Sequence, residues 1–296
     1  MTRFLAIFLT GLLRLLARVP LRGLHALGAL VGWGYYAASS THRARFRRNA
    51  AQAGIPWAQA RGGIAATGRM MLELPPLWLR PPGTPLPMPV QWHGGERIEA
   101  AQAAGRGLVM LTPHLGGFEA IGQSYAERYG ERCGAMTVLY RPARQPWLQG
   151  LVDAARRRPG LDAAPATLAG VRQMMRALKR GEVVGLLPDQ VPPTGLGVWA
   201  PFFGRPAYTM TLAARLVQQT GAALLLVWGE RLPQGAGYLV RVSELGEPLP
   251  DDTVAAATVI NLAMQRLILQ CPQQYLWGYH RYRQPRAVPR RPPELP

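Results

Sequence analysis

Beyond residue 91 the sequence alternates short apolar runs with longer stretches of helical periodicity, and this alternation restricts the possible folds more than any other feature. Apolar runs of about four to eight residues, bounded by glycine, proline or polar residues, are typical of buried strands. The predicted strands cover residues 107–112, 134–139, 182–187, 222–228 and 237–242, and the predicted helices cover residues 117–129, 146–157, 167–180, 208–220 and 251–270. This succession predicts an α/β fold in which a mixed sheet is flanked by helices on both faces.

The distribution of proline divides the chain into three regions. Residues 75–91 contain too many prolines for regular structure. They join a helical N-terminal segment, residues 1–74, to the sheet, and they form the beginning of the sheet domain, residues 75–284. Residues 285–296 are mainly proline and arginine with little to bury, so we expect a flexible basic tail.

The N-terminal segment is both apolar and basic. No acidic residue precedes Glu73, and two apolar stretches, residues 4–13 and 27–38, lie among arginines. Neither stretch reaches the roughly 20 apolar residues of a spanning helix, and Arg14 interrupts a signal-peptide pattern. A tilted spanning helix and a soluble helical hairpin are the alternatives. An apolar helix with an arginine edge favours the membrane interface, so we expect a membrane-associated segment with the bulk of the protein on the cytoplasmic side.

The whole chain carries a formal charge of +18, and Lys179 is its only lysine. Arginine binds phosphate and carboxylate groups through a planar fork of donors, which indicates anionic partners. A nucleic-acid-binding protein would need a recognisable module or a basic helix with stacking aromatics, and the sequence shows neither. The two cysteines, Cys133 and Cys271, have no metal-binding or redox spacing, so no metal site is expected.

The segment with the clearest chemistry runs from His114 to Glu119. Pro113 ends the predicted strand 107–112, so His114 lies on the loop at the strand's end, where open α/β sheets bind ligands. A histidine there can act as a general base, and a nearby carboxylate such as Glu119 can hold its tautomer and stabilise the imidazolium ion. The spacing by itself is weak evidence, because a histidine and an acid this close together occur in many proteins.

Further polar and aromatic segments occur along the same domain. They are residues 140–142 with Arg141, the arginine run 156–158 with Arg156, Asp189-Gln190 directly after the strand 182–187, and residues 201–204 with Phe202 and Phe203. Each has an ordinary structural explanation when taken singly. Arginines can complement a helix C-terminus, an aspartate can be a turn residue, and phenylalanines can belong to the core.

In this order, the segments resemble the late acyltransferases of lipid A biosynthesis, which belong to the glycerolipid acyltransferase superfamily with its H-x4-D/E motif. The matching segments are His114 with Glu119, residues 140–142, 176–184, 187–190 and 201–204, and the C-terminal residues 272–277 with His280 and Arg281 beyond them. The resemblance covers residues 5–283, and it implies a fold like that of the glycerolipid acyltransferases.

The resemblance implies an enzyme that moves a fatty acyl chain from acyl carrier protein to a hydroxyl of a lipid A precursor, at the cytoplasmic face of the inner membrane. His114 would be the base and Glu119 its partner, and the implied substrate-binding residues are Arg141, Arg156, Asp189 and Gln190. The implied partners are acyl carrier protein, a phosphorylated lipid and the membrane, with no metal and no cofactor besides the acyl thioester. Two departures from the family pattern, Arg144-Gln145 and residues 280–283, bear on which acceptor is bound.

The residues agree with this chemistry. An alcohol needs a base in contact before it attacks a thioester, and His114 can take its proton. Backbone N–H groups around Gly116-Gly117 and the guanidinium of Arg156 are the candidates for stabilising the oxyanion. The absence of a G-x-S-x-G elbow argues against an acyl-serine intermediate.

An apolar groove for the acyl chain is also expected. Its candidate wall residues are Trp199, Phe202, Phe203 and Tyr208, for which membership of the core is the alternative. The motifs leave the acceptor open: lysophosphatidate, an ornithine lipid or another glycolipid would use the same base and acid.

Overall fold

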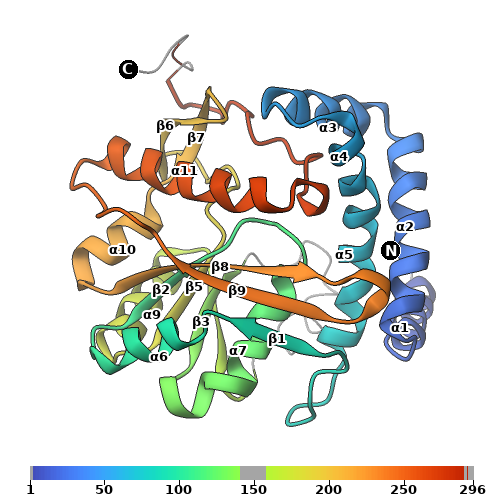
Figure 1. The fold of residues 1–296 in the computed structure, drawn as a ribbon, viewed down its shortest axis with the longest axis horizontal. Helices are drawn as coiled ribbons and strands as arrows, with labels where there is room; N and C mark the ends of the chain where they lie inside the picture. Colours follow the sequence, from blue (N-terminus) through green and yellow to red (C-terminus); the bar gives the residue numbers. More distant parts are fainter. Residues whose placement is uncertain (1–2, 141–157, 290–291, 293–296) are drawn as a thin grey trace.

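The computed structural model describes residues 3–140, 158–289 and 292, and it contains the predicted mixed sheet flanked by helices (Figure 1). The sheet has seven strands in the order β1-β9-β8-β2-β5-β3-β4. They are β1 (Val90–His93), β2 (Leu108–Leu111), β3 (Met136–Tyr140), β4 (Leu161–Pro165), β5 (Val183–Leu186), β8 (Ala223–Arg231) and β9 (Tyr238–Glu244). Because β8 and β9 pair antiparallel, β1 and β9 run opposite to the remaining strands, which are parallel to one another.

The central strand β2 shows why the apolar runs form this sheet. All of its side chains are buried, and it lies between β8 and β5. Leu108 and Met110 pack on one face with α6 (Glu96–Ala103) and α7 (Phe118–Cys133). Val109 and Leu111 pack on the other face. The helices there are α9 (Leu168–Lys179), α10 (Leu212–Thr220) and α11 (Thr253–Gln270). A strand covered on both faces needs an unbroken apolar run, which is the pattern seen in the sequence.

Two parts of the sheet domain differ from the predictions. Strands β1 and β4, at the two edges of the sheet, are short and include exposed positions, so their sequences lack a continuous apolar run. The predicted helix 208–220 begins only at Leu212, because residues before it form the hairpin of β6 (Gly197–Phe202) and β7 (Arg205–Met210). Pairing with β6 outweighs the local helical periodicity there. The predicted helix 146–157 lies outside the described residues.

Five helices form the N-terminal part of the described chain. They are α1 (Arg3–Leu16), α2 (Leu21–Ala38), α3 (Ser40–Gln52), α4 (Trp57–Ala60) and α5 (Gly62–Trp78). Helices α2 and α5 touch through glycines: a Cβ on Gly68 would lie 2.0 Å from the carbonyl oxygen of Gly28. The prediction that regular structure stops at residue 75 is wrong, because α5 continues through Pro75 and Pro76 to Trp78.

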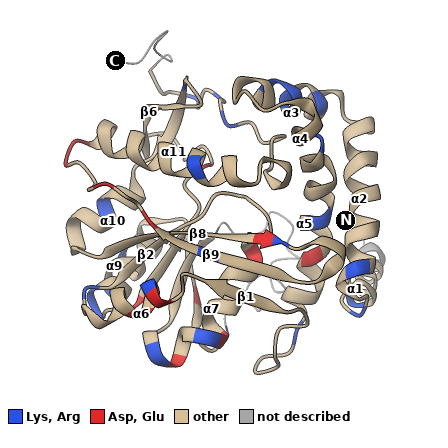
Figure 2. Ribbon diagram, in the orientation of Figure 1, with Lys and Arg blue, Asp and Glu red and all other residues tan. Residues whose placement is uncertain are grey.

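The N-terminal helices expose apolar side chains. No described helix is both long enough and apolar enough to cross a membrane. Large apolar residues nevertheless point outward from α1 and α2, among them Phe8, Leu15, Leu30 and Trp33, with Leu30 70% exposed. Figure 2 shows basic residues along α1 and α3, and no acidic residue precedes Glu73 on α5. Membrane association therefore stays a prediction.

The beginning of the predicted flexible tail has partners. The hydroxyl of Thr194 donates to the carbonyl of Arg286, and the indole N–H of Trp199 donates to the carbonyl of Pro289. Residues 286–289 therefore follow the surface of the region around β6 instead of extending freely into solvent.

Candidate active site

Two neighbouring parallel strands bring His114 and Asp189 together. His114 follows β2, and Asp189 follows β5, which pairs in parallel with β2. The carboxyl ends of parallel strands meet at the same edge of a sheet, so residues separated by 75 positions become neighbours there. The sequence predicted both strand ends but not that they are adjacent.

Asp189 contacts His114 twice. The Nδ1 atom of the imidazole lies 2.6 Å from Oδ1, and the backbone N–H of His114 donates to Oδ2 over 2.9 Å. The hydroxyl of Tyr275 also donates to Oδ2, over 3.2 Å. Burial by itself would raise the pKa of Asp189, but the hydrogen bonds from His114, and the charge of its ring when it is protonated, outweigh burial and hold that pKa below its usual value. Asp189 is therefore a buried, ionised carboxylate.

This contact fixes the tautomer of His114. An ionised carboxylate only accepts hydrogen bonds, so Nδ1 carries the proton of the neutral imidazole. The Nε2 atom is then an acceptor, and the side-chain amide of Gln190 donates to it over 2.9 Å. A histidine in this state has the lone pair on the atom that can receive a proton from a substrate.

The backbone of the loop after β2 is held from several sides. The N–H of Gly116 donates to the carbonyl of Gln274 over 3.2 Å, and the N–H of Gly117 donates to the carbonyl of Gly229 over 2.7 Å. These are the groups that the sequence offered as oxyanion donors. Both N–H groups already donate within the protein, so neither of these two is available to an oxyanion in this structure.

A cavity of about 550 Å³ opens beside the imidazole. Its walls are mainly apolar and include Val138, Leu139, Leu161, Val171, Leu196, Leu212 and Leu216. His114, Glu119 and Gln190 also line it. Glu119 lies in the first turn of α7, one residue after Phe118, whose ring packs edge-on against the imidazole with centroids 4.9 Å apart. The position at Nδ1 that the sequence gave to Glu119 is occupied by Asp189.

The other predicted site residues lie elsewhere. Trp199, Phe202, Phe203 and Tyr208 belong to the β6–β7 hairpin, and none of them lines the cavity. Phe202 and Tyr208 are almost fully buried, since the hairpin packs against α11, so their assignment to the acyl groove is corrected to core. Arg141 and Arg156 lie outside the described residues.

The structure adds two residues that the sequence analysis left without a role. Burial raises the pKa of Tyr275 well above its usual value, so its hydroxyl keeps the proton that it donates to Asp189. Arg281 is buried and donates to the carbonyl of Tyr208 over 2.8 Å, and its charge contributes to the low pKa of Asp189. Tyr275 and Arg281 lie in the C-terminal segment that resembles the acyltransferase family. That resemblance is the only sequence signal that pointed to them.

No group of three or more histidine, cysteine, aspartate or glutamate side chains in the described ranges could hold a metal ion. Cys133 and Cys271 are buried free thiols. Burial raises the pKa of both, that of Cys271 to about 12, so neither is a reactive thiolate.

The sequence is similar to those of known proteins. Residues 1–284 match the model of the family described as bacterial lipid A biosynthesis acyltransferase. The chain is 31% identical over 204 residues to the lipid A biosynthesis lauroyltransferase of Escherichia coli K12, which covers 67% of this chain and 63% of that protein. It is 28% identical to the lipid A biosynthesis palmitoleoyltransferase of the same organism, over 64% of this chain and 60% of the relative. A phosphatidylinositol mannoside acyltransferase of Mycobacterium tuberculosis is 32% identical over 45% of the chain and 41% of its own length. The alignments thus span a little under two thirds of the length of the two lipid A acyltransferases.

Proposed function

The chain belongs to the bacterial lipid A biosynthesis acyltransferase family, as the sequence motifs predicted, and we propose that it transfers a fatty acyl chain from a thioester to a hydroxyl group of a lipid A precursor. The observation that carries this proposal is the His114–Asp189 pair at the edge of an apolar cavity. The volume of the cavity falls within the range of about 300–1,000 Å³ that is common for ligand sites. Its apolar walls suit an acyl chain.

In the proposed reaction, the acceptor hydroxyl takes the place of the Gln190 amide at Nε2 of His114. His114 accepts the hydroxyl proton while the oxygen attacks the thioester carbon. The tetrahedral intermediate then collapses, the carbon–sulfur bond breaks, and the departing sulfur takes the proton from the imidazolium. General base catalysis of this kind contributes about 10²–10⁴-fold.

Asp189 and Glu119 have different roles in this proposal. Asp189 orients the imidazole through Nδ1 and stabilises the imidazolium that forms during the reaction. Glu119 lines the cavity, where its carboxylate can hold the acceptor close to Nε2. Arg156 is the candidate for the oxyanion donor in this proposal. No metal and no cofactor besides the thioester enter the proposal.

We take acyl carrier protein as the donor and the cytoplasmic face of the inner membrane as the place of reaction. The excess of arginine suits an acidic carrier protein, phosphorylated lipids and an anionic membrane surface. The outward-facing apolar side chains of α1 and α2 support membrane attachment of the N-terminal helices.

A second acceptor class has its own support. One relative is named a phosphatidylinositol mannoside acyltransferase, so proteins similar to this chain include one whose name points to another glycolipid. The base and its carboxylate would serve either acceptor, as they would serve lysophosphatidate or an ornithine lipid.

Mass spectrometry of the purified protein with acyl carrier protein thioesters tests the proposal. The acceptors offered are a tetra-acylated lipid A precursor, lysophosphatidate, a lyso-ornithine lipid and a phosphatidylinositol mannoside. We expect the lipid A precursor to gain the mass of one acyl chain. Transfer only to another of these lipids would make that lipid the acceptor in place of the lipid A precursor. Transfer to none of the lipids would refute the proposal.

A further inference from the structure

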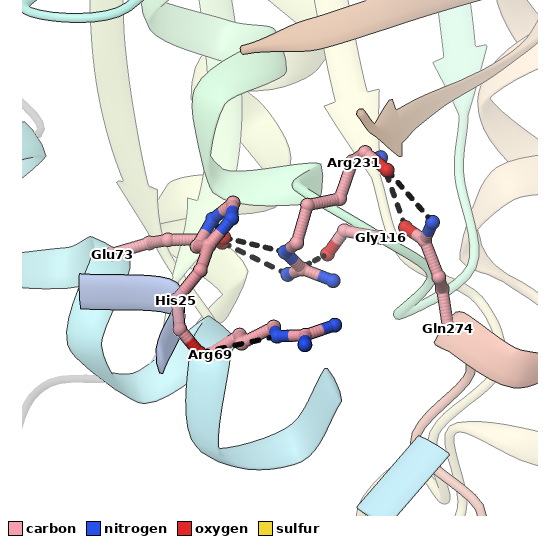
Figure 3. Close-up of polar contacts among 6 residues, drawn as sticks. All are labelled: His25, Arg69, Glu73, Gly116, Arg231 and Gln274. Atoms are coloured by element: carbon pink, nitrogen blue, oxygen red, sulfur yellow. Dashed lines mark hydrogen bonds and ion pairs between the residues drawn. The ribbon is translucent and has the colours of Figure 1, made fainter. Parts of the chain in front are cut away.

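A second buried polar cluster lies behind the loop that carries His114, and the proposed reaction does not use this cluster (Figure 3). Arg231, at the end of β8, pairs with Glu73 on α5 through Nε at 2.5 Å and Nη2 at 2.9 Å. His25, on α2, lies 2.6 Å from Glu73 through Nε2. The side chains of Glu73 and Arg231 are each only 3% exposed.

Burial of such a pair is costly. Removing two charges from water costs several kcal/mol per ion, and a buried ion pair is often no more stable than apolar side chains of the same size. Burial opposes ionisation of both Glu73 and Arg231, but the charge and hydrogen bonds of each partner stabilise the charged form of the other and outweigh that effect. The pKa of Glu73 is held below its usual value, and the pKa of Arg231 is held above its usual value. The pair is therefore ionised, and stability alone does not account for it.

The cluster holds the loop that carries His114. The Nη2 atom of Arg231 donates to the carbonyl of Gly116 over 3.1 Å. The backbone of Arg231 is held in turn by the side chain of Gln274, which accepts from its N–H and donates to its carbonyl, each over 2.9 Å. The carbonyl of Gln274 accepts from the N–H of Gly116. The peptide groups on both sides of Gly116 thus have fixed partners from the same cluster (Figure 3).

Gly116 is also where the loop is most tightly confined. Its φ is +57°, and a Cβ at this position would lie 2.0 Å from the carbonyl oxygen of Gly229. The backbone can approach β8 this closely only because the residue is glycine. His114 precedes it by two positions, so a shift of the Gly116 peptide would move the imidazole relative to the cavity.

We propose that Arg231 and Glu73 are positioning residues for acyl transfer: Arg231, oriented by Glu73, holds the carbonyl of Gly116 and thereby keeps His114 aimed into the cavity. The inference rests on the proposed function, since it gives these residues a part in the same reaction. It also ties α5 of the N-terminal region to the catalytic loop through one guanidinium.

The test is the double variant E73L/R231M, which replaces both charges by apolar side chains. Removing both partners of a buried pair is often nearly neutral for stability, whereas the Gly116 carbonyl loses its donor in this variant. We expect a melting temperature close to that of the wild type, an unchanged KM, and a kcat lower by about 100-fold, because small misplacements of a catalytic group have effects of this size. Hydrogen exchange of the amides in residues 114–117 should become at least about tenfold faster.

The double variant E230L/R241M is the matched control. It removes another Arg–Glu pair of β8 and β9, in which Nη2 of Arg241 lies 2.7 Å from Glu230. Neighbouring residues of a strand point to opposite faces, so Glu230 points away from the face of Arg231. The control should retain wild-type kcat and wild-type loop exchange.

Arg231→Lys provides a second variant that does not depend on the fold tolerating two apolar residues. A lysine keeps the charge beside Glu73, but its single ammonium group lacks the fork that reaches Glu73 and Gly116 together. Its loop exchange should rise and its kcat should fall with KM unchanged. Wild-type loop exchange and wild-type kcat in both Arg231 variants would overturn the inference. Exchange needs no acyl transfer, so faster exchange in variants of a wild type that transfers no acyl chain would refute the proposed function alone.

Discussion

Two histidine–carboxylate pairs in the described part of the chain have the same N···O distance but different surroundings. His114 and Asp189 are 2.6 Å apart at the cavity, and His25 and Glu73 are 2.6 Å apart behind the loop. In the first pair, the other ring nitrogen of His114 contacts the side-chain amide of Gln190 at the cavity wall. In the second, the carboxylate is already paired with the buried guanidinium of Arg231.

The difference teaches what makes such a pair chemically useful. Asp189 has no guanidinium hydrogen-bonded to it among the described contacts, so it can stabilise a positive charge that appears on His114. Glu73 has its charge compensated by Arg231 whether or not His25 is protonated. The distance is therefore not what distinguishes the two pairs. They differ in whether the histidine faces the cavity and in whether the charge of the carboxylate is already compensated by an arginine.

The largest expected effect comes from His114→Ala. Removing the base should lower kcat by about 10³–10⁴-fold while the melting temperature stays near that of the wild type, because the imidazole lies at a cavity edge and not in the core. Steady-state acyl transfer and thermal unfolding measure the two quantities. Near-normal turnover in a folded variant would mean that the cavity pair is not the catalytic one.

Glu73→Gln should have the next largest effect, on stability. It leaves the guanidinium of Arg231 buried without its counter-charge, and breaking a buried pair in this way costs about 3–5 kcal/mol. Denaturant unfolding at neutral pH measures the loss. A variant as stable as the wild type would show that the folded protein does not need Glu73 to compensate the charge of Arg231.

The control is the pH dependence of the stability that Glu73→Gln loses. The pKa of Glu73 is lowered in the folded protein, so its contribution is fully present above the pKa of an unfolded glutamate and disappears as the pH falls through the folded value. The stability gap between wild type and Glu73→Gln should therefore narrow in acid. A gap that is constant between neutral and acidic pH would contradict the ionised state of Glu73.

Asp189→Asn should lower kcat by about 100-fold, since the amide cannot stabilise the imidazolium and can favour the wrong tautomer. Glu119→Gln is the matched variant, because Glu119 is an acid that lines the same cavity as His114. We expect its main effect on KM for the acceptor. If the two variants exchanged these signatures, Glu119 would be the orienting carboxylate and Asp189 the acceptor-binding one.

The smallest effect is expected from His25→Ala. The Glu73–Arg231 pair and its contact with Gly116 do not pass through His25, so kcat should stay within about threefold of the wild type. Loss of one buried hydrogen bond should lower stability by about 1–3 kcal/mol. A large loss of turnover here would place His25 in the positioning cluster and remove the distinction between the two pairs.

Much of the sheet could be predicted from local pattern. Buried strands such as β2, β5 and β8 are covered on both faces, so their apolar runs are visible in the sequence. The edge strands β1 and β4 were missed because they are short and include exposed positions, and the hairpin β6–β7 was missed because its second strand overlaps a stretch with helical periodicity. Two aromatic residues of the hairpin, Phe202 and Tyr208, were predicted in a groove and are buried in the core.

The site was predicted in its parts and not in its connections. His114 and Asp189 stand at strand ends that the sequence marks clearly, and Glu119 is close to His114 in the chain. Spacing suggested the nearer acid as the partner of the imidazole, but Glu119 lies in the first turn of α7, while Asp189 follows β5, the strand next to β2. Glu73 and Arg231, 158 residues apart, carry no local signal at all.

The sequence by itself determined the α/β architecture, the family, and the histidine at the end of a buried strand, because each of these depends on short-range periodicity or on residues within one segment. Tertiary structure decided which carboxylate meets which histidine, and which of the two pairs faces a cavity. Those outcomes depend on strand order and burial. Both are set by packing between residues far apart in the chain, where a buried charge must find its partner.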